Sequence, residues 1–214
     1  MLEQRYKWKN KQIREQIAVI NGAKAPHILL TNAVYLNQNL RKWMKANIWI
    51  YEDRIVYVGS NLPQNTEGCE MVDCSSYYLV PGYIEPHVHP FQLYNPQTFS
   101  KYASRTGTTT FINDNMVIFL HLSKKKAFSL LEEFKQSPMS MYWWCRFDPQ
   151  TEIADEETIF SHRNIKAWLE NDAVVQGGEL TGWPKLLAGD DLQLHWIQEA
   201  KRMNKRIEGH FPGA

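Results

Sequence analysis

The sequence contains few cysteines and no long apolar run. Cys69, Cys74 and Cys145 are too few and too irregularly spaced for a disulfide framework or for a zinc site built on thiolates. No stretch of about 18 or more apolar residues is present, and the first residues are polar and charged, unlike a signal sequence. We therefore expect a cytoplasmic protein with reduced thiols and no membrane partner.

Excess charge and phosphate-binding loops are also missing. The 24 Lys and Arg residues nearly balance the 23 Asp and Glu residues, and the resulting net charge of +1 predicts no nucleic-acid partner. Neither a P-loop nor a glycine-rich dinucleotide fingerprint occurs, so the sequence does not indicate a nucleotide cofactor. With 214 residues, of which 43% are hydrophobic, the chain has enough apolar material to form the core of a soluble enzyme piece.

The N-terminal region has helical periodicity. Residues 3–20 are charged throughout and place Ile13, Ile17 and Ile20 on one helical face. This pattern predicts a helical packing arm within residues 1–26.

The following region changes to β-rich runs. Within residues 27–80, two such runs flank a short polar break at Glu52 and Asp53, which is typical of a hairpin. We expect a small β domain over this range.

Residues 81–214 alternate short β-prone runs with helical segments, which is typical of a parallel α/β sheet. A complete barrel of this class has about eight such units, and we find about five. The expected fold class is therefore α/β, a small N-terminal β domain followed by an incomplete (β/α)8 TIM-type barrel, in an N-terminal fragment of a longer protein. Expected strands are 79–85, 108–113, 139–146, 173–176 and 206–208; expected helices are 95–105, 117–136, 156–170 and 190–204, the last capped by Asp190 or Asp191.

Two histidines end the first strand of this second region, in the segment PGYIEPHVHP at residues 81–90. Side chains alternate along a strand, so His87 and His89 point to the same side and can bind one metal ion. Enzymes built on parallel barrels place such ligands where a strand ends in a loop. The pair therefore predicts a metal site.

Two later strand ends also carry side chains that can bind metal. The segment QGGELTGWP brings Glu179 after a β-branched run, and RIEGHFPGA brings His210 after another short strand. Asp114 follows a strand as well, where it orients a ligand or substrate, or forms an Asx turn. Thr181, two residues after Glu179, lines the pocket or serves a turn of the chain.

This ordered set of segments resembles the amidohydrolase superfamily of metal-dependent hydrolases, and within it the adenine deaminases. Many members have a carboxylated lysine in the bridging place, whereas the GGEL segment contains no lysine, which favours the adenine deaminase branch over the hydantoinase and dihydroorotase branches. The region upstream is similar to the small β domain of the family. The matching segments are VPGYIEPHVHP at 80–90, TGTTTFINDN at 106–115, GGEL at 177–180 and EGHFPGA at 208–214.

The resemblance implies a ligand set and a cofactor. His87 and His89 would hold one divalent metal, Glu179 would bridge two metals as the catalytic carboxylate, and His210 would bind the second metal. Manganese, iron and zinc all accept such ligands, and we expect manganese or iron. Asp114 and Thr181 are the candidate substrate residues.

The activity implied is hydrolytic deamination of adenine to hypoxanthine and ammonia by a metal-bound hydroxide. A divalent metal lowers the pKa of a bound water from about 15.7 toward 7, which makes that nucleophile available. The expected partner is a small-molecule purine, and a second copy of the protein, forming a homo-oligomer, is a further candidate partner. The later ligands of the family and its proton-shuttle aspartate have no counterpart before Ala214, so we expect the parent protein, and not this chain alone, to be active.

Two loops depart from the family pattern. PFQLYNP, after the first histidine pair, is rich in aromatic residues and proline, and INDNMVIFLH lacks the histidine expected soon after the aspartate. Three alternatives therefore stay open, namely another aminopurine as substrate, an amidohydrolase acting on a cyclic amide or ureide, and a non-catalytic fragment or binding protein.

The remaining histidines and the aromatic cluster have structural interpretations. Four further histidines lie in or beside predicted strand and helix surfaces, where histidines usually have structural roles. Tyr142, Trp143 and Trp144 lie in a predicted barrel strand, and we expect them mostly in the core with one ring near the pocket. The four histidines are His27, His121, His162 and His195.

Overall fold

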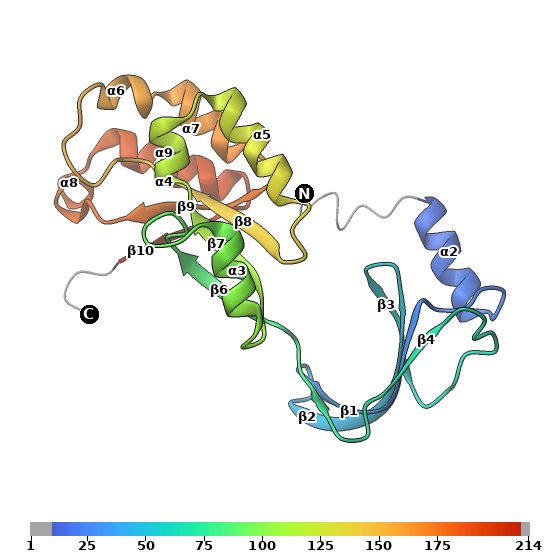
Figure 1. The fold of residues 1–214 in the computed structure, drawn as a ribbon. Coiled ribbons are helices and arrows are strands. Elements are labelled where there is room, and N and C mark those ends of the chain that lie inside the picture. The colour runs from blue at the N-terminus through green and yellow to red at the C-terminus, as the bar shows by residue number, and fades with distance from the viewer. Residues whose placement is uncertain (1–9, 211–214) are drawn as a thin grey trace. The chain divides into compact units, whose positions relative to one another are not determined.

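The structure is a computed structural model that describes residues 10–210 (Figure 1). Its described residues form two compact units, residues 10–81 and residues 82–210. Predictions for residues 3–9, and for the last residues of the 208–214 segment, lie outside the described range. Within that range no helix is long and apolar enough to cross a membrane.

The first unit is a five-stranded sheet with one helix. The sheet has the order β3-β2-β1-β4, and β5 also pairs with β1. The pairs β1–β2 and β2–β3 are antiparallel, whereas β4 and β5 run parallel to β1. The hairpin predicted at Glu52 and Asp53 is confirmed, since it connects β2 to β3. The elements are α2 (Asn10–Ile20), β1 (Ile28–Asn37), β2 (Lys42–Tyr51), β3 (Arg54–Gly59), β4 (Glu70–Asp73) and β5 (Tyr78–Leu79).

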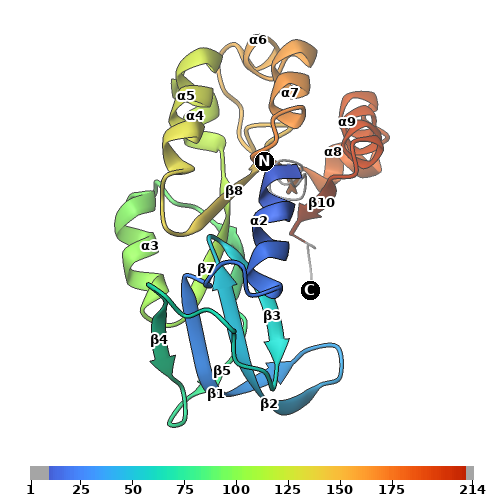
Figure 2. The same ribbon diagram turned by 90° about the vertical axis from the view of Figure 1, so that its right-hand side faces the viewer.

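Helix α2 packs against this sheet near β3 (Figure 2), but not through the predicted face. Val19 is fully buried and packs with Leu29 and Trp49 of the sheet. Ile17 and Ile20 remain 48% and 49% exposed, so the predicted isoleucine face was wrong. Helical spacing allows more than one apolar stripe, and the sheet buries the stripe that contains Val19.

The second unit is a parallel sheet whose strands follow chain order. All pairs between neighbours are parallel, from β6 at one edge to β10 at the other. Five strands of this kind agree with the five units predicted. The strands are β6 (Tyr83–Val88), β7 (Thr108–Asp114), β8 (Ser140–Cys145), β9 (Val174–Leu180) and β10 (Arg206–Gly209); the helices are α3 (Pro96–Ser104), α4 (Met116–His121), α5 (Lys124–Phe134), α6 (Glu156–Ile159), α7 (His162–Leu169), α8 (Trp183–Leu187) and α9 (Asp191–Arg202).

The helices of this unit differ from the prediction in three places. The predicted helix 117–136 is broken into α4 and α5, because Leu122 adopts an extended conformation. The predicted helix 156–170 is likewise broken into α6 and α7. Helix α8 forms where a turn was expected, since Pro184 is well suited to the first helical turn. The predicted cap of α9 is confirmed, as the Asp190 side chain accepts a hydrogen bond from Gln193 N at 2.8 Å.

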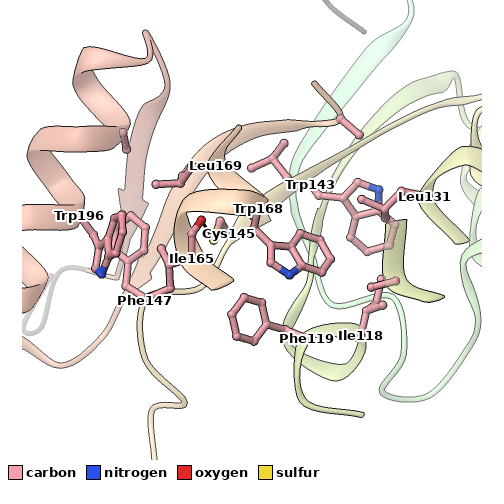
Figure 3. Close-up of a cluster of buried hydrophobic side chains, with 14 of the residues drawn as sticks. Ile118, Phe119, Leu131, Trp143, Cys145, Phe147, Ile165, Trp168, Leu169 and Trp196 are labelled. Atoms are coloured by element: carbon pink, nitrogen blue, oxygen red, sulfur yellow. Dashed lines mark hydrogen bonds between the residues drawn. The ribbon is translucent and has the colours of Figure 1, made fainter. Parts of the chain in front are cut away.

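Strand β8 contributes to both faces of the sheet. Met141, Trp143 and Cys145 belong to the main hydrophobic core (Figure 3). Because successive side chains of a strand point to opposite faces, Tyr142 and Trp144 lie on the other face. Both faces of β8 are covered, as is usual for a parallel strand. The helices contribute to the same core through Ile118, Leu131, Trp168 and Trp196, among others.

Strands β9 and β10 approach each other closely at a glycine. Gly178 has a φ of 124°, a conformation that L side chains rarely adopt. A Cβ atom at this position would lie 2.2 Å from the backbone oxygen of Glu208. Glycine at 178 therefore allows β9 to bring the next residue, Glu179, beside β10.

Replacing this glycine is expected to destabilise the fold. Gly178→Ala should lower the free energy of unfolding by about 3 kcal/mol, because both the backbone conformation and the space are unsuited to a Cβ atom. Gly189→Ala is the matched control, since its φ is 82° but nothing lies within 4 Å of the added Cβ. This control should lose only about 1 kcal/mol. Urea unfolding of both variants measures the difference, and equal losses would contradict the close approach at Gly178.

Candidate metal centre

The carboxyl ends of the five parallel strands meet at one edge of the sheet, as they do in barrel enzymes. The sheet is strongly curled there. In a flat sheet, β6 and β10 would be about 19 Å apart, because each of the four spacings is about 4.8 Å. Instead, the Nδ1 atom of His87 contacts Glu208 Oε1, which joins the two edge strands. The polar side chains collected at this edge are His87, His89, Asp114, Arg146, Glu179, Glu208 and His210.

The two histidines of the first strand face each other through their Nε2 atoms, which are 2.9 Å apart. His89 Nδ1 donates to Asp114 Oδ2 at 2.8 Å, and His87 Nδ1 donates to Glu208 Oε1. A carboxylate only accepts hydrogen bonds, so each histidine has a proton on Nδ1, and in the neutral imidazole this leaves a lone pair on Nε2. Two opposed lone pairs repel each other, and a cation bound by both removes that repulsion.

Glu179 completes this arrangement from β9. Its side chain is 2% exposed, with Oε1 at 3.7 Å from His87 Nε2 and Oε2 at 3.9 Å from His89 Nε2. One ligand atom from each of the three residues lies within 4.8 Å of the others. Glu179 Oε2 has no hydrogen-bond donor, although it is buried. Two imidazoles and a carboxylate with free lone pairs fit a divalent cation such as zinc, iron or manganese.

His210 lies on the other side of the Glu179 carboxylate. Its Nε2 atom contacts Glu179 Oε1, and its ring centroid is 5.4 Å from that of His87. The His210 side chain is 65% exposed, unlike Glu179. The structure thus brings together all four residues predicted as metal ligands, with Glu179 between the histidine pair and His210.

Arg146 is a central residue of the site that was not among the residues predicted from the sequence. Its Nε and Nη2 atoms donate to Asp114 Oδ1 and Oδ2 at 2.9 Å and 2.7 Å. Nη2 also lies 2.7 Å from Glu179 Oε2 as an ion pair, without hydrogen-bond geometry. Burial favours the neutral form of Asp114, but the hydrogen bonds and charge of Arg146 outweigh burial and lower the pKa of this carboxyl below its usual value.

Two signals in the sequence pointed toward the missed residues. Arg146 directly follows a strand, as His89 follows its strand, so the rule that strand ends carry function also applies to it. Glu208 precedes His210 by two residues, and the two-residue period of a strand places both on one face. Neither residue type forms a recognisable motif by itself, so their partners appear only in the structure.

The two candidate substrate residues occupy different surroundings. Asp114 binds His89, and its Oδ1 atom also accepts from Met116 N at 2.9 Å. The Asp114 side chain therefore does both things considered for it: it orients a neighbouring residue, His89, and it forms an Asx turn. Thr181 follows β9, and its buried hydroxyl has no hydrogen-bond partner among the described residues.

The aromatic ring expected near the pocket is that of Trp144, whose centroid lies 4.6 Å from the His87 ring. The other histidines lie outside the cluster. His27 Nδ1 accepts from Glu52 N at 3.0 Å in the first unit, and His162 and His195 pack around Trp196.

Several curated proteins are similar to this chain in sequence. The "Putative adenine deaminase" of Bacillus cereus is 60% identical over 209 residues, which are 98% of this chain and 36% of that protein. The protein of the same name from Bacillus subtilis is 52% identical over 214 residues, all of this chain and 37% of its own length. The "Adenine deaminase" of Kosmotoga olearia is 28% identical over 200 residues, 92% of this chain and 34% of that protein. The chain thus spans about a third of the length of these relatives.

Solved structures show the same fold at low sequence identity. The D-hydantoinase from Bacillus sp. AR9 matches with a TM-score of 0.60 and 16% identity, over 86% of this chain and 39% of that chain. The L-hydantoinase (dihydropyrimidinase) from Arthrobacter aurescens matches with a TM-score of 0.55 and 15% identity, over 86% and 40%. These matches confirm the predicted fold class, a curled parallel sheet that forms part of a barrel. The profile of the amidohydrolase family matches residues 78–214, and the chain therefore belongs to the amidohydrolase family.

Proposed function

We propose that the protein containing this chain is a metal-dependent hydrolase that deaminates adenine, with hypoxanthine and ammonia as products. The observation that carries the proposal is the pair of opposed imidazole lone pairs beside the Glu179 carboxylate. The names of the similar curated proteins support adenine as the first substrate to test.

Four side chains would hold the metal ions. His87, His89 and Glu179 converge on one position, and Glu179 and His210 offer ligands for a second. When bound, a divalent metal supplies an acidified water as nucleophile and polarises the bond under attack. We propose manganese or iron, a binuclear centre and a soluble cytoplasmic enzyme, with a second copy of the protein as a candidate partner.

The surrounding residues position these ligands. Asp114 and Glu208 fix the orientation and tautomer of the two imidazoles, which leaves both Nε2 atoms available. Arg146 holds Asp114 and Glu179 in place, and its charge offsets part of their mutual repulsion. This arrangement preorganises the site before the substrate arrives.

The reaction product separates this proposal from its main alternative. Attack at the ring carbon that bears the exocyclic amine of adenine releases ammonia and leaves the ring closed. Hydrolysis of a cyclic amide or ureide opens the ring to an acid without releasing ammonia. A panel of both substrate kinds, analysed for ammonia and for ring-opened acid, therefore distinguishes the two reactions.

Loss of a metal ligand is expected to abolish deamination. His87→Ala and Glu179→Ala, made in the full reading frame and tested with added manganese or iron, should lower ammonia release from adenine by a factor of about 10³ or more. His121→Ala is the matched control, because this exposed histidine lies at the end of α4. Metal content is measured in parallel. Retention of activity by either ligand variant would refute the proposed mechanism.

Loss of the carboxylate behind His87 is expected to weaken metal binding. Glu208→Gln should raise the metal dissociation constant by about 10-fold to 100-fold, because the amide holds the imidazole less firmly and makes it less basic. Glu132→Gln is the control, since the Glu132 side chain is exposed on α5. Competition with a chelating dye measures both constants. Equal metal affinity in the two variants would contradict the positioning role of Glu208.

A further inference from the structure

A small hollow lies beside the metal ligands, at the ends of β6, β7 and β8. Its volume is about 170 Å³, and its polar side is formed by His89, Asp114 and Arg146. Phe91 and Met116 add apolar surface to its lining. This volume is below the range of about 300 to 1,000 Å³ that accommodates drug-sized ligands, so the hollow suits a small ring compound.

Arg146 lines this hollow, but its charge is already balanced there. Its side chain is 2% exposed, and its guanidinium group forms ion pairs with both Asp114 and Glu179. The Nη1 atom has no acceptor among the described residues, but it is fully buried and does not face the open space. A hollow whose cationic side chain is already paired favours a neutral ring over an anion.

Gln150 lies at the rim of the hollow in an uncommon backbone conformation. Its φ is 65°, which costs free energy for a residue other than glycine. Asp148 holds the turn, because its Oδ1 atom accepts from Gln150 N at 3.0 Å. Asp148 is itself buried and bound through Oδ2 to Gln193 Nε2 of α9 at 2.8 Å. The buried Asp148 carboxylate thus holds the backbone of Gln150, which places the exposed Gln150 amide at the rim of the hollow.

We propose that this hollow is the subsite that receives the ring of a neutral amino-heterocycle. The ring lies against Phe91 and Met116, and the amides of Gln150 and Gln92 bind its outer edge. An amide offers both a donor and an acceptor, which matches the paired donor and acceptor atoms along the edge of a purine. This inference rests on the proposed function for the choice of ligand, but binding of the ring to the hollow does not require that the protein turn it over.

The sharpest test replaces Gln150 by glycine in the metal-loaded protein expressed from its full reading frame. Gln150→Gly removes the amide, and glycine accepts the positive φ, so the melting temperature should not fall. The KM for adenine should rise about tenfold through the lost hydrogen bonds, while kcat changes less than about threefold. Gln150→Glu keeps the length but removes the donors of the amide. Gln97→Ala is the control, because this exposed glutamine lies on α3, away from the hollow.

Binding is measured separately from turnover. Calorimetry with adenine and with guanine, which adds a carbonyl oxygen, reports the dissociation constant for each kind of acceptor. If the protein binds either compound without deaminating it, and Gln150→Gly weakens that binding about tenfold, the subsite stands and the proposed function fails.

Two outcomes would overturn the subsite. The first is unchanged KM and affinity in both Gln150 variants of an active enzyme, which leaves the proposed function intact. The second is a protein that binds neither compound at about 1 mM, a concentration at the upper end of ordinary KM values.

Discussion

The contact between His87 and Glu208 joins the two edge strands of the parallel sheet, and the metal centre depends on it. Only a curled sheet allows β6 and β10 to share a hydrogen bond across three intervening strands. The same curl brings Glu179 of β9 opposite the histidine pair and His210 beside Glu179. The curvature of the sheet therefore determines the distances between ligands that are far apart in the sequence.

Strand β8 connects the packing of the core with the chemistry of the site. Trp143 and Cys145 lie among the helices, whereas Trp144 contacts the His87 ring at an interplanar angle of 36°. Arg146 continues on the side of Trp144 and reaches Asp114 and Glu179. Because alternate residues of one rigid strand serve the two faces, a shift of β8 in the core would move the guanidinium group relative to both carboxylates.

Much of the fold and the ligand set was predictable from the sequence, for reasons that particular residues show. His87, His89, Glu179 and His210 each follow a short β-prone run, and the parallel topology then places strand ends together. Arg146 was not predictable in the same way, because its role comes from two carboxylates on other strands.

The misplaced helical features have a different origin. The buried face of α2 was predicted wrongly, because periodicity defines apolar stripes without saying which of them the sheet will cover. The breaks between α4 and α5, and between α6 and α7, interrupt sequences whose polar and apolar residues continue in a helical pattern. Local backbone geometry at one or two residues decides such breaks, and tertiary packing decides that geometry.

The charges gathered at the site have a consequence for the metal-free chain. Asp114, Glu179 and Glu208 bring three carboxylates to the cluster, and Arg146 brings one guanidinium. With neutral imidazoles, these groups leave an excess of two negative charges in a largely buried region, equal and opposite to the charge of one divalent cation. Binding of the first of the two proposed metal ions would thus make the centre electrically neutral, and a metal-free centre would leave the carboxylates repelling one another inside the sheet.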